Sequence, residues 1–226
     1  MKTKNPNYPV IIAKTAQTLD GKIAAAGGHS KWVTSGDVRA FARKKRNQFD
    51  AIVVGINTVL ADNPELTPAH PRKRLKKIVL DSRLRIPVTA RLFQKARPED
   101  CYILTTKKAD RRKMEQLKKK GVHVLVGPVS GGHVSLRWAR KMFILLKFKK
   151  VLLEGGAKLI GAALKERMVD AMHIYIAPKI AGDQNALSSV QGLKLNNMNK
   201  TVQLKNLRAQ TIKNHLFIQA DVYRNR

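Results

Sequence analysis

Apolar residues recur along this chain in two patterns, as short continuous runs and as longer stretches with helical spacing. The short runs predict strands at 10–19, 50–55, 76–82, 100–106, 122–127, 150–154 and 171–180. The longer stretches predict helices at 34–49, 56–62, 110–121, 136–148 and 157–168. Strand and helix alternate through most of the chain, which is typical of an α/β sheet with right-handed crossovers.

The end of the chain follows a different pattern. Residues 201–224 predict two strands joined by a turn near Lys213 and Asn214, an antiparallel hairpin. We therefore expect an α/β fold with a mixed, mostly parallel sheet flanked by helices. No linker, composition break or internal repeat interrupts residues 1–226, so the sequence predicts a single domain.

Local signals predict where two of the helices begin and end. Thr34 is the expected N-cap of the first helix, with Asp37 three residues later as a short capping-box partner. Gly121 is expected to end the basic helix over 110–121.

Polar and glycine residues follow the ends of several predicted strands, where open α/β sheets bind ligands. They are Thr18 and Asp20, Gly55 with Asn57 and Thr58, Asp81 and Ser82, Thr105 and Thr106, and the run Glu154-Gly155-Gly156. An acid and two glycines after an apolar strand let a ligand approach the start of the next helix. The dinucleotide fingerprint G-x-G-x-x-G is absent, so a tight turn with a solvated acid explains the run equally well.

Composition narrows the class of protein. A hydrophobic share of 43% is enough for a core, and a single cysteine, Cys101, indicates a reducing, cytoplasmic setting. The chain begins without a signal-peptide pattern, and its apolar runs are too short to span a bilayer.

The formal net charge of +30 indicates either an anionic partner or solvated basic faces. Residues 107–150 hold 14 of the 45 Lys and Arg, beside Asp110 and Glu115 as the acids of that stretch. The aromatic share is only 5%, and no aromatic residues alternate with the basic ones, so nucleic acid is not expected as a partner.

Three separated stretches carry a resemblance to a known family. The first is "KTAQTLDGKIA" followed by "SKWVTS", the second is "DAIVVGINTVLADNPELT" followed by "IVLDSRLRIP", and the third is "LLEGGAKL" followed by "VDAMHIYIAPKIAG". Together, over residues 8–185, their order and spacing resemble the pyrimidine reductases of riboflavin biosynthesis. In many bacteria this reductase is fused behind a deaminase.

The resemblance implies a dihydrofolate-reductase-like fold, a homodimer, NADPH as hydride donor and no metal. It implies a ribosylamino-pyrimidine 5′-phosphate as substrate, 5-amino-6-(5-phosphoribosylamino)uracil or its 2,5-diamino counterpart. The sugar is reduced to a ribityl group. The implied catalytic residues are Lys14 and Glu154, and the implied substrate contacts are Ser30, Arg46, Leu66 and Glu154. The implied cofactor contacts are Ala16, Trp32, Thr58, Asp62, Ser82, Gly156, Ala157, Lys158, Leu159, Ile160, Gly161 and Ala162.

Each of these residue types also has an ordinary structural explanation. Lys14 is also consistent with a surface lysine, Arg46 with a solvated helix face, and Trp32 with a half-buried core residue. Thr58 and Asp62 flank a short helix and suit capping, and Asp20 with Gly21 is first of all a turn. Lys107 and Lys108, just beyond a strand, are candidates for binding the 2′-phosphate that distinguishes NADPH from NADH.

The sequence departs from the family at three points. Ala69 replaces an arginine that commonly contacts substrate, and His70, Arg72 and Arg74 are the candidate substitutes. Ala171 replaces a common acid, which should matter little. No deaminase domain precedes the reductase, so we expect a stand-alone reductase served by a separate deaminase.

Two alternatives stay open. One is a reductase of the same fold for another heterocycle such as a pterin. The other is a basic RNA-binding protein.

Overall fold

The apolar runs of the sequence form strands in the computed structural model, which describes residues 8–94 and 97–223. Contacts within the chain group into two compact units. The first consists of Met1–Val10 and Arg43–Leu152, and the second of Ile11–Ala42 and Leu153–Arg226. Strand β9 (Lys150–Glu154) carries the chain from the first unit into the second.

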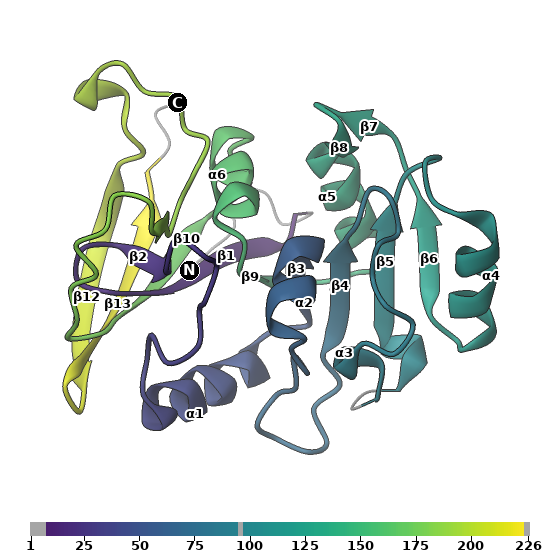
Figure 1. Ribbon diagram of the computed structural model, residues 1–226, viewed down its shortest axis with the longest axis horizontal. Helices are drawn as coiled ribbons and strands as arrows, with labels where there is room; N and C mark the ends of the chain where they lie inside the picture. The colour runs from purple at the N-terminus through teal and green to yellow at the C-terminus, as the bar shows by residue number, and fades with distance from the viewer. Residues whose placement is uncertain (1–7, 95–96, 224–226) are drawn as a thin grey trace. The chain divides into compact units, whose positions relative to one another are not determined.

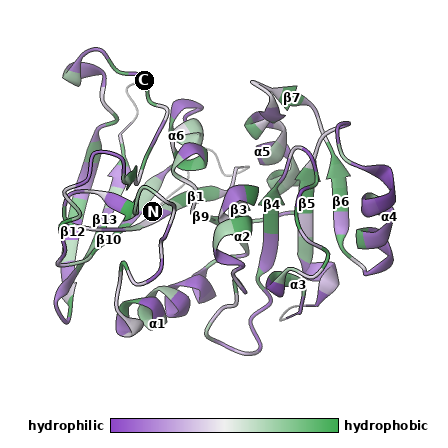
Figure 2. Ribbon diagram, in the orientation of Figure 1, coloured by the Kyte–Doolittle hydropathy of each residue, from purple (hydrophilic) through white to green (hydrophobic). Residues whose placement is uncertain are grey.

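The first unit contains four parallel strands hydrogen-bonded in the order β3, β4, β5 and β6 (Figure 1). All five residues of β5 are buried, which explains its unbroken apolar run, since parallel sheets are covered on both faces. Figure 2 shows these strands as largely hydrophobic. The strands are β3 (Ala51–Gly55), β4 (Lys76–Leu80), β5 (Cys101–Thr105) and β6 (His123–Val126).

Helices and short elements complete the first unit. They are η1 (Arg46–Gln48), α2 (Ile56–Asp62), α3 (Arg91–Gln94), η2 (Pro98–Asp100), α4 (Arg111–Lys119), the hairpin of β7 (Val129–Ser130) and β8 (His133–Val134), and α5 (Leu136–Leu145). Gly127 packs closely against the ring of Trp138 from α5. A Cβ at position 127 would lie only 2.3 Å from the indole, so a larger residue would not fit there without a shift.

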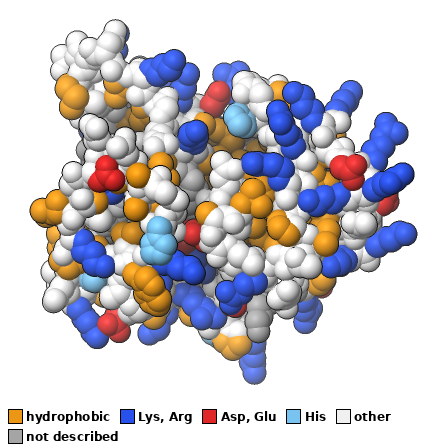
Figure 3. Space-filling view, viewed as in Figure 1, with side chains coloured by type: hydrophobic (Ala, Val, Ile, Leu, Met, Phe, Trp, Pro, Cys, Tyr) orange, Lys and Arg blue, Asp and Glu red, His pale blue; other side chains and the backbone are white. Residues whose placement is uncertain are grey.

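Helix α4 carries many of the basic residues of the 107–150 stretch. Its Arg111, Arg112, Lys118 and Lys119 are exposed, and Lys118 pairs with Glu115 at 3.0 Å. Lysine and arginine gather over the part of the first unit that carries α4 (Figure 3). Gly121, at φ 85°, follows the end of this helix as predicted.

The second unit combines parallel and antiparallel pairing. Strand β1 (Val10–Gln17) pairs parallel with β10 (Ala171–Ile176). Strand β13 (His215–Val222) then pairs antiparallel with both β10 and β12 (Leu204–Ile212). The turn between β12 and β13 is at Lys213 and Asn214, so the predicted hairpin and the mixed, mostly parallel α/β fold are confirmed.

The core of the second unit lies between α1 (Gly36–Lys45) and the strands β10 and β13. Val38, Tyr175 and Phe217 are each 1% exposed, and the ring centroids of Phe41 and Phe217 are 5.4 Å apart in an edge-to-face arrangement. The remaining elements are β2 (Lys22–Ala24), which pairs with β11 (Leu187–Ser188), together with α6 (Ala157–Lys165) and η3 (Met198–Lys200).

The start of α1 differs from the sequence prediction. Ser35, not Thr34, is the N-cap: its carbonyl accepts from Arg39 N and its hydroxyl accepts from Val38 N at 3.5 Å. Asp37 pairs instead with Lys213 at 2.6 Å, a contact that a local capping pattern cannot reveal. Within the described residues, no helix combines the length and the apolar character needed to cross a membrane.

Candidate active site

The acid at the end of β9 has a basic partner. Lys14 Nζ, from β1, donates to Glu154 Oε1 at 3.2 Å, and the two side chains are only 17% and 15% exposed. Limited exposure reduces screening by water, so this pair interacts more strongly than a fully exposed one. The structure therefore brings together the two residues predicted to be catalytic.

An aromatic ring adjoins this ion pair. Lys14 Nζ is 5.5 Å from the centroid of Tyr175, which is 1% exposed in β10. Ala16 is the register partner of Tyr175 and shares a strand face with Lys14, since alternate residues point the same way. The predicted cofactor position Ala16 thus lies on the same strand face as Lys14, which is predicted to be catalytic.

The two glycines after Glu154 have a conformational reason. Gly155 has φ 90° and Gly156 has φ 81°, values that other residues adopt only with strain. Gly156 is the N-cap of α6, and no side chain caps this helix start. The first backbone N–H groups of α6 therefore suit an anionic ligand group.

Only part of the predicted cofactor segment faces solvent. Lys158 and Ala162 are exposed and Leu159 is half-buried, whereas Ala157, Ile160 and Gly161 are buried. A Cβ on Gly161 would lie 1.8 Å from Gln191 O, and Gln191 N donates to Ala157 O at 3.1 Å. Gly161 therefore permits close packing against the backbone at Gln191, which accounts for this glycine without a ligand.

Asp20, in the stretch "KTAQTLDGKIA", bonds to the backbone at the end of the stretch "VDAMHIYIAPKIAG". Its Oδ1 accepts from the Thr18 hydroxyl at 2.5 Å and from Ala181 N at 3.0 Å, and its Oδ2 accepts from Gly182 N at 2.9 Å. The Thr18 hydrogen bond first, and then those from Gly182 and Ala181, hold the pKa of Asp20 well below its ordinary value. The turn at Asp20 and Gly21 is thus a structural anchor.

Trp32 lies in an exposed loop of the second unit. It is 67% exposed, so the alternative of a half-buried core tryptophan is wrong. Its φ of 69° is unusual for a bulky residue, and Lys179 Nζ donates to its carbonyl at 2.7 Å. The Arg39 guanidinium lies 4.7 Å from the ring centroid. Ser30, two residues earlier, is half-buried.

Arg46 bonds to the backbone next to Leu66 in the first unit. Arg46 Nη1 donates to Thr67 O at 3.0 Å. Leu66 is 3% exposed and has φ 52°, so its backbone is in the left-handed region that a leucine rarely adopts. The predicted substrate contact Arg46 therefore holds the backbone next to the predicted contact Leu66.

The segment around Ala69 is held by the end of α1 and by η1. Asn47 Oδ1 accepts from Ala69 N at 3.1 Å and from His70 N at 3.0 Å, and Arg43 Nε donates to Pro68 O at 3.3 Å. Arg43 therefore places a guanidinium beside the position where the family arginine is missing. No motif in the sequence pointed to this residue.

Of the three proposed substitutes at this position, Arg74 already has carboxylate partners. Its guanidinium donates to both oxygens of Asp100, at 3.1 Å and 2.6 Å, and this pairing raises the pKa of Arg74. His70 and Arg72 are exposed. Arg43, His70 and Arg72 thus remain as candidates.

The other predicted cofactor residues of the first unit lie in helix α2 and after strand β4. Thr58 is inside α2, whose N-cap Gly55 makes no side-chain bond, so capping does not explain Thr58. Asp62 is the last, exposed residue of α2. Ser82 follows β4, and its Oγ accepts from Val134 N at 2.9 Å, which leaves the hydroxyl hydrogen for a ligand.

The fold and these strand-end groups define an α/β protein of the kind that binds small molecules at its strand ends. The sequence model of the RibD C-terminal domain matches residues 9–218, and the chain belongs to this family.

Two relatives illustrate the similarity. The riboflavin biosynthesis protein RibD of Actinobacillus pleuropneumoniae is 38% identical over 198 residues, 87% of this chain and 52% of that protein. The chain thus spans about half the length of such curated relatives. The 2,5-diamino-6-ribosylamino-4(3H)-pyrimidinone 5′-phosphate reductase of Methanothermobacter thermautotrophicus is 32% identical over 95% of this chain and 98% of its own.

A solved structure agrees with the fold. RibD of Acinetobacter baumannii (form 2) superposes with a TM-score of 0.82 at 25% identity, covering 96% of this chain and 58% of that one.

The anchor at Asp20 makes a prediction about pH. A lowered pKa means that the carboxylate stabilises the folded chain above its unperturbed value of 3.8 and that this contribution is lost as the pH falls below it. We expect Asp20→Asn to lower the melting temperature at pH 7 and the difference from wild type to shrink towards pH 3. Circular dichroism melts measure both, with Asp183→Asn in the neighbouring loop as control. An equal difference at both pH values would contradict the role of the charge.

Proposed function

We propose that this chain is an NADPH-dependent reductase. Its proposed substrate is 5-amino-6-(5-phosphoribosylamino)uracil or the 2,5-diamino-pyrimidinone counterpart, whose ribose is reduced to a ribityl group. The observation that carries the proposal is the Lys14–Glu154 pair directly before the uncapped start of α6. Membership of the RibD C-terminal domain family and the archaeal relative named as a reductase support it.

The residues present fit a nicotinamide dinucleotide. Two glycines with positive φ and an uncapped helix start suit a pyrophosphate, and the Ser82 hydroxyl can donate to a phosphate or ribose oxygen. Trp32 offers an apolar ring in a loop of the second unit. When bound, the cofactor supplies the hydride.

Lys14 and Glu154 then carry the proton chemistry in our proposal. The ribose must open at C1′ before it accepts a hydride, and the opening leaves an oxygen that needs a proton. The Lys14 ammonium is the donor we assign to that step. Glu154 directs this ammonium through the 3.2 Å hydrogen bond.

The substrate phosphate is assigned to the basic side chains of the first unit. Arg46 and Arg43 donate to the consecutive carbonyls of Thr67 and Pro68, so both side chains bond to the same short segment. Guanidinium groups suit the oxygens of a phosphate dianion. Arg43 is thus our candidate to replace the arginine missing at Ala69, with His70 and Arg72 nearby.

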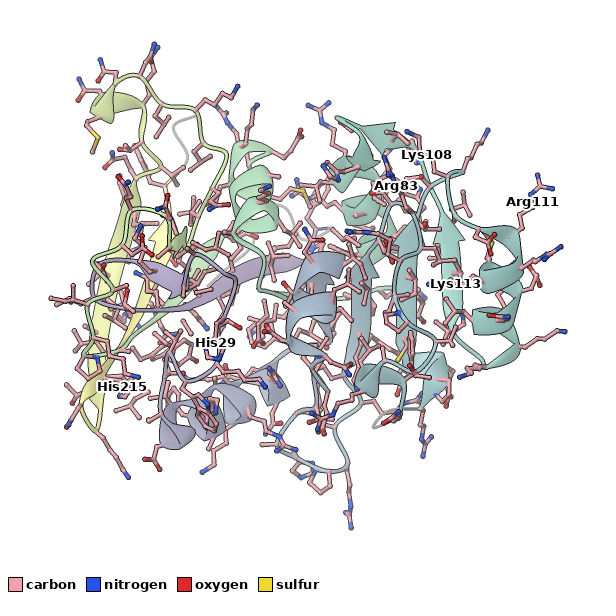
Figure 4. All side chains as sticks on the ribbon, in the orientation of Figure 1. His29, Arg83, Lys108, Arg111, Lys113 and His215 are labelled. Carbon is pink, nitrogen blue, oxygen red and sulfur yellow. The ribbon has the colours of Figure 1, made fainter. Side chains whose placement is uncertain are left out.

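Arg83 and Lys108 are our candidates for recognising the 2′-phosphate. Thr106 Oγ1 donates to Ser82 O at 2.7 Å and accepts from Lys108 N at 3.2 Å, so the turns after β4 and β5 are joined. Both side chains are exposed, and they lie at the same end of the first unit (Figure 4). A guanidinium and an ammonium match a phosphate dianion that NADH lacks.

A second copy of the chain is the partner we propose for the outer face of β10 and β13. Ile174 pairs in register with Ile218, and Ile176 pairs with Leu216, so all four side chains lie on one face. Leu216 is 38% exposed, the three isoleucines are half-buried, and every residue of β12 except Ile212 is exposed. An apolar face beside an exposed edge strand is typical of a homodimer interface.

We also place the enzyme in the cytoplasm. Cys101 is buried, and burial raises the pKa of its thiol to about 11, so the thiol suits a reducing compartment without a further role.

The direct test of function is turnover. We expect the wild-type protein to oxidise NADPH in the presence of one of the two ribosylamino-pyrimidine phosphates, and Glu154→Gln to lower kcat roughly 10²-fold or more, because a neutral amide attracts and directs the Lys14 side chain less strongly than a carboxylate does. The melting temperature should change little, and Glu115→Gln on α4 is the matched control. Failure of the wild type on both pyrimidines, with turnover of a pterin or tight RNA binding instead, would reject the proposal.

The preference for NADPH over NADH tests whether Arg83 and Lys108 bind the 2′-phosphate. Arg83→Ala and Lys108→Ala should each raise KM for NADPH about tenfold while leaving KM for NADH unchanged, since only NADPH carries the 2′-phosphate. Steady-state kinetics with both cofactors measure the ratio, and Arg111→Ala, on the outside of α4, is the control (Figure 4). An equal loss with both cofactors would argue against 2′-phosphate recognition.

The oligomeric state in solution tests whether the apolar face of β10 and β13 is a dimer interface. Light scattering should give the mass of a dimer for the wild type and of a monomer for Leu216→Lys, because a charge on this face opposes burial. Leu145→Lys, at a 70% exposed leucine of α5, should stay dimeric. A monomeric wild type would contradict the interface.

A further inference from the structure

Lys77 is a buried charged residue near the start of the apolar strand β4. It belongs to β4, is 2% exposed, and its register partners Ile52 and Cys101 are both 0% exposed. Its Nζ donates to two backbone carbonyls, Glu65 O at 2.5 Å and Leu92 O at 3.0 Å. The ammonium therefore joins β4 to the turn that follows α2 and to α3.

Stability alone does not explain a lysine at this position. Burial lowers the pKa of the Lys77 ammonium, which means that the site disfavours the charge. Replacing a buried charge with a well-packed apolar side chain is often neutral or stabilising. The charge is therefore better explained by what its two hydrogen bonds hold in place.

These bonds hold the turn that contains Leu66, whose φ of 52° is unfavourable for a leucine. Lys77 holds the carbonyl before Leu66, and Arg46 holds the carbonyl after it at 3.0 Å. On the other side of the turn, Arg91 pairs with the Glu65 carboxylate, and Arg91 N donates to Asn63 Oδ1 at 2.9 Å. The unusual conformation is thus fixed by cationic side chains on both sides of Leu66.

We propose that Lys77 is a positioning residue for substrate binding, which acts through the Glu65–Thr67 turn on Leu66 and Arg46. The inference rests on the proposed function, in which these two residues contact the phosphorylated substrate. Lys77 itself is buried and does not touch the substrate. Its loss should therefore affect KM for the pyrimidine phosphate and spare the hydride-transfer step.

The first experiment compares Lys77→Met with wild type and with Lys119→Met, an exposed lysine of α4. We expect Lys77→Met to raise KM for the pyrimidine phosphate about tenfold, with kcat and KM for NADPH within about threefold of wild type, since the turn is loosened and the chemistry is untouched. In combination with Leu66→Ala, the effects on KM should be less than additive, because both changes act on one turn. Additive effects, or a lower melting temperature with unchanged KM, would overturn the proposal.

The second experiment does not depend on catalysis. Hydrogen exchange of Lys77→Met should be faster in residues 63–70 and 91–94 and unchanged in β3 and β5, and Lys77→Arg, which retains donors, should restore part of the protection. Exchange that is uniformly faster, or loss of folding in both variants, would make Lys77 a residue of general stability. If the wild type fails to reduce either pyrimidine, this measurement still decides whether Lys77 holds the turn.

Discussion

The placement of charge at the end of an apolar strand is the constraint on which the candidate site depends. Glu154 ends a strand whose three preceding residues are buried, so an unpartnered carboxylate there would lose hydration without compensation. Lys14 removes this difficulty, and the two glycines that follow turn the chain directly into α6. One ion pair thus allows a partly buried acid and an uncapped helix start to lie next to each other.

In both units, polar side chains hold turns by bonding to the backbone. Asp20 accepts from the amides of Ala181 and Gly182, and Lys179 donates to the carbonyl of Trp32. In the first unit, Arg46 and Lys77 do the same for the turn at Leu66. Several motif residues therefore serve the geometry of neighbouring residues, because a loop that must present ligands in a fixed conformation needs bonds that helices and strands do not supply.

The sequence allowed much of the fold to be predicted. The unbroken apolar runs of β3, β4 and β5 and the turn at Lys213 and Asn214 were placed correctly, since burial on both faces and turn chemistry are local signals. The short pairing of β2 with β11 was missed, because it joins segments more than 160 residues apart through only a few bonds. The N-cap was assigned one residue too early, to Thr34, because both Thr34 and Ser35 carry a capping hydroxyl.

The site was predictable only where a family motif marked it. Lys14 and Glu154 were named through the resemblance, and the structure brings them together. No sequence motif indicated Arg43 or Lys77. Arg43 is part of a basic run, and Lys77 stands at the start of the apolar strand in "KKIVLDS". Their contacts with Pro68, Glu65 and Leu92 join segments that are separated in sequence, and a single sequence contains no record of such contacts.

The net charge of +30 is also best understood by dividing the basic residues according to what they touch. Some, such as Arg74 with Asp100, have carboxylate partners, and others, such as Lys77 and Arg46, donate to carbonyls. Residues 107–150 hold 14 basic residues beside two acids, so a positive field remains over this part of the first unit. The exposed cations of α4 add to the field of the first unit, which attracts phosphorylated molecules at low ionic strength and weakens as salt shortens the screening length. The charge is therefore explained by many separate contacts together with one shared field, without requiring a nucleic acid.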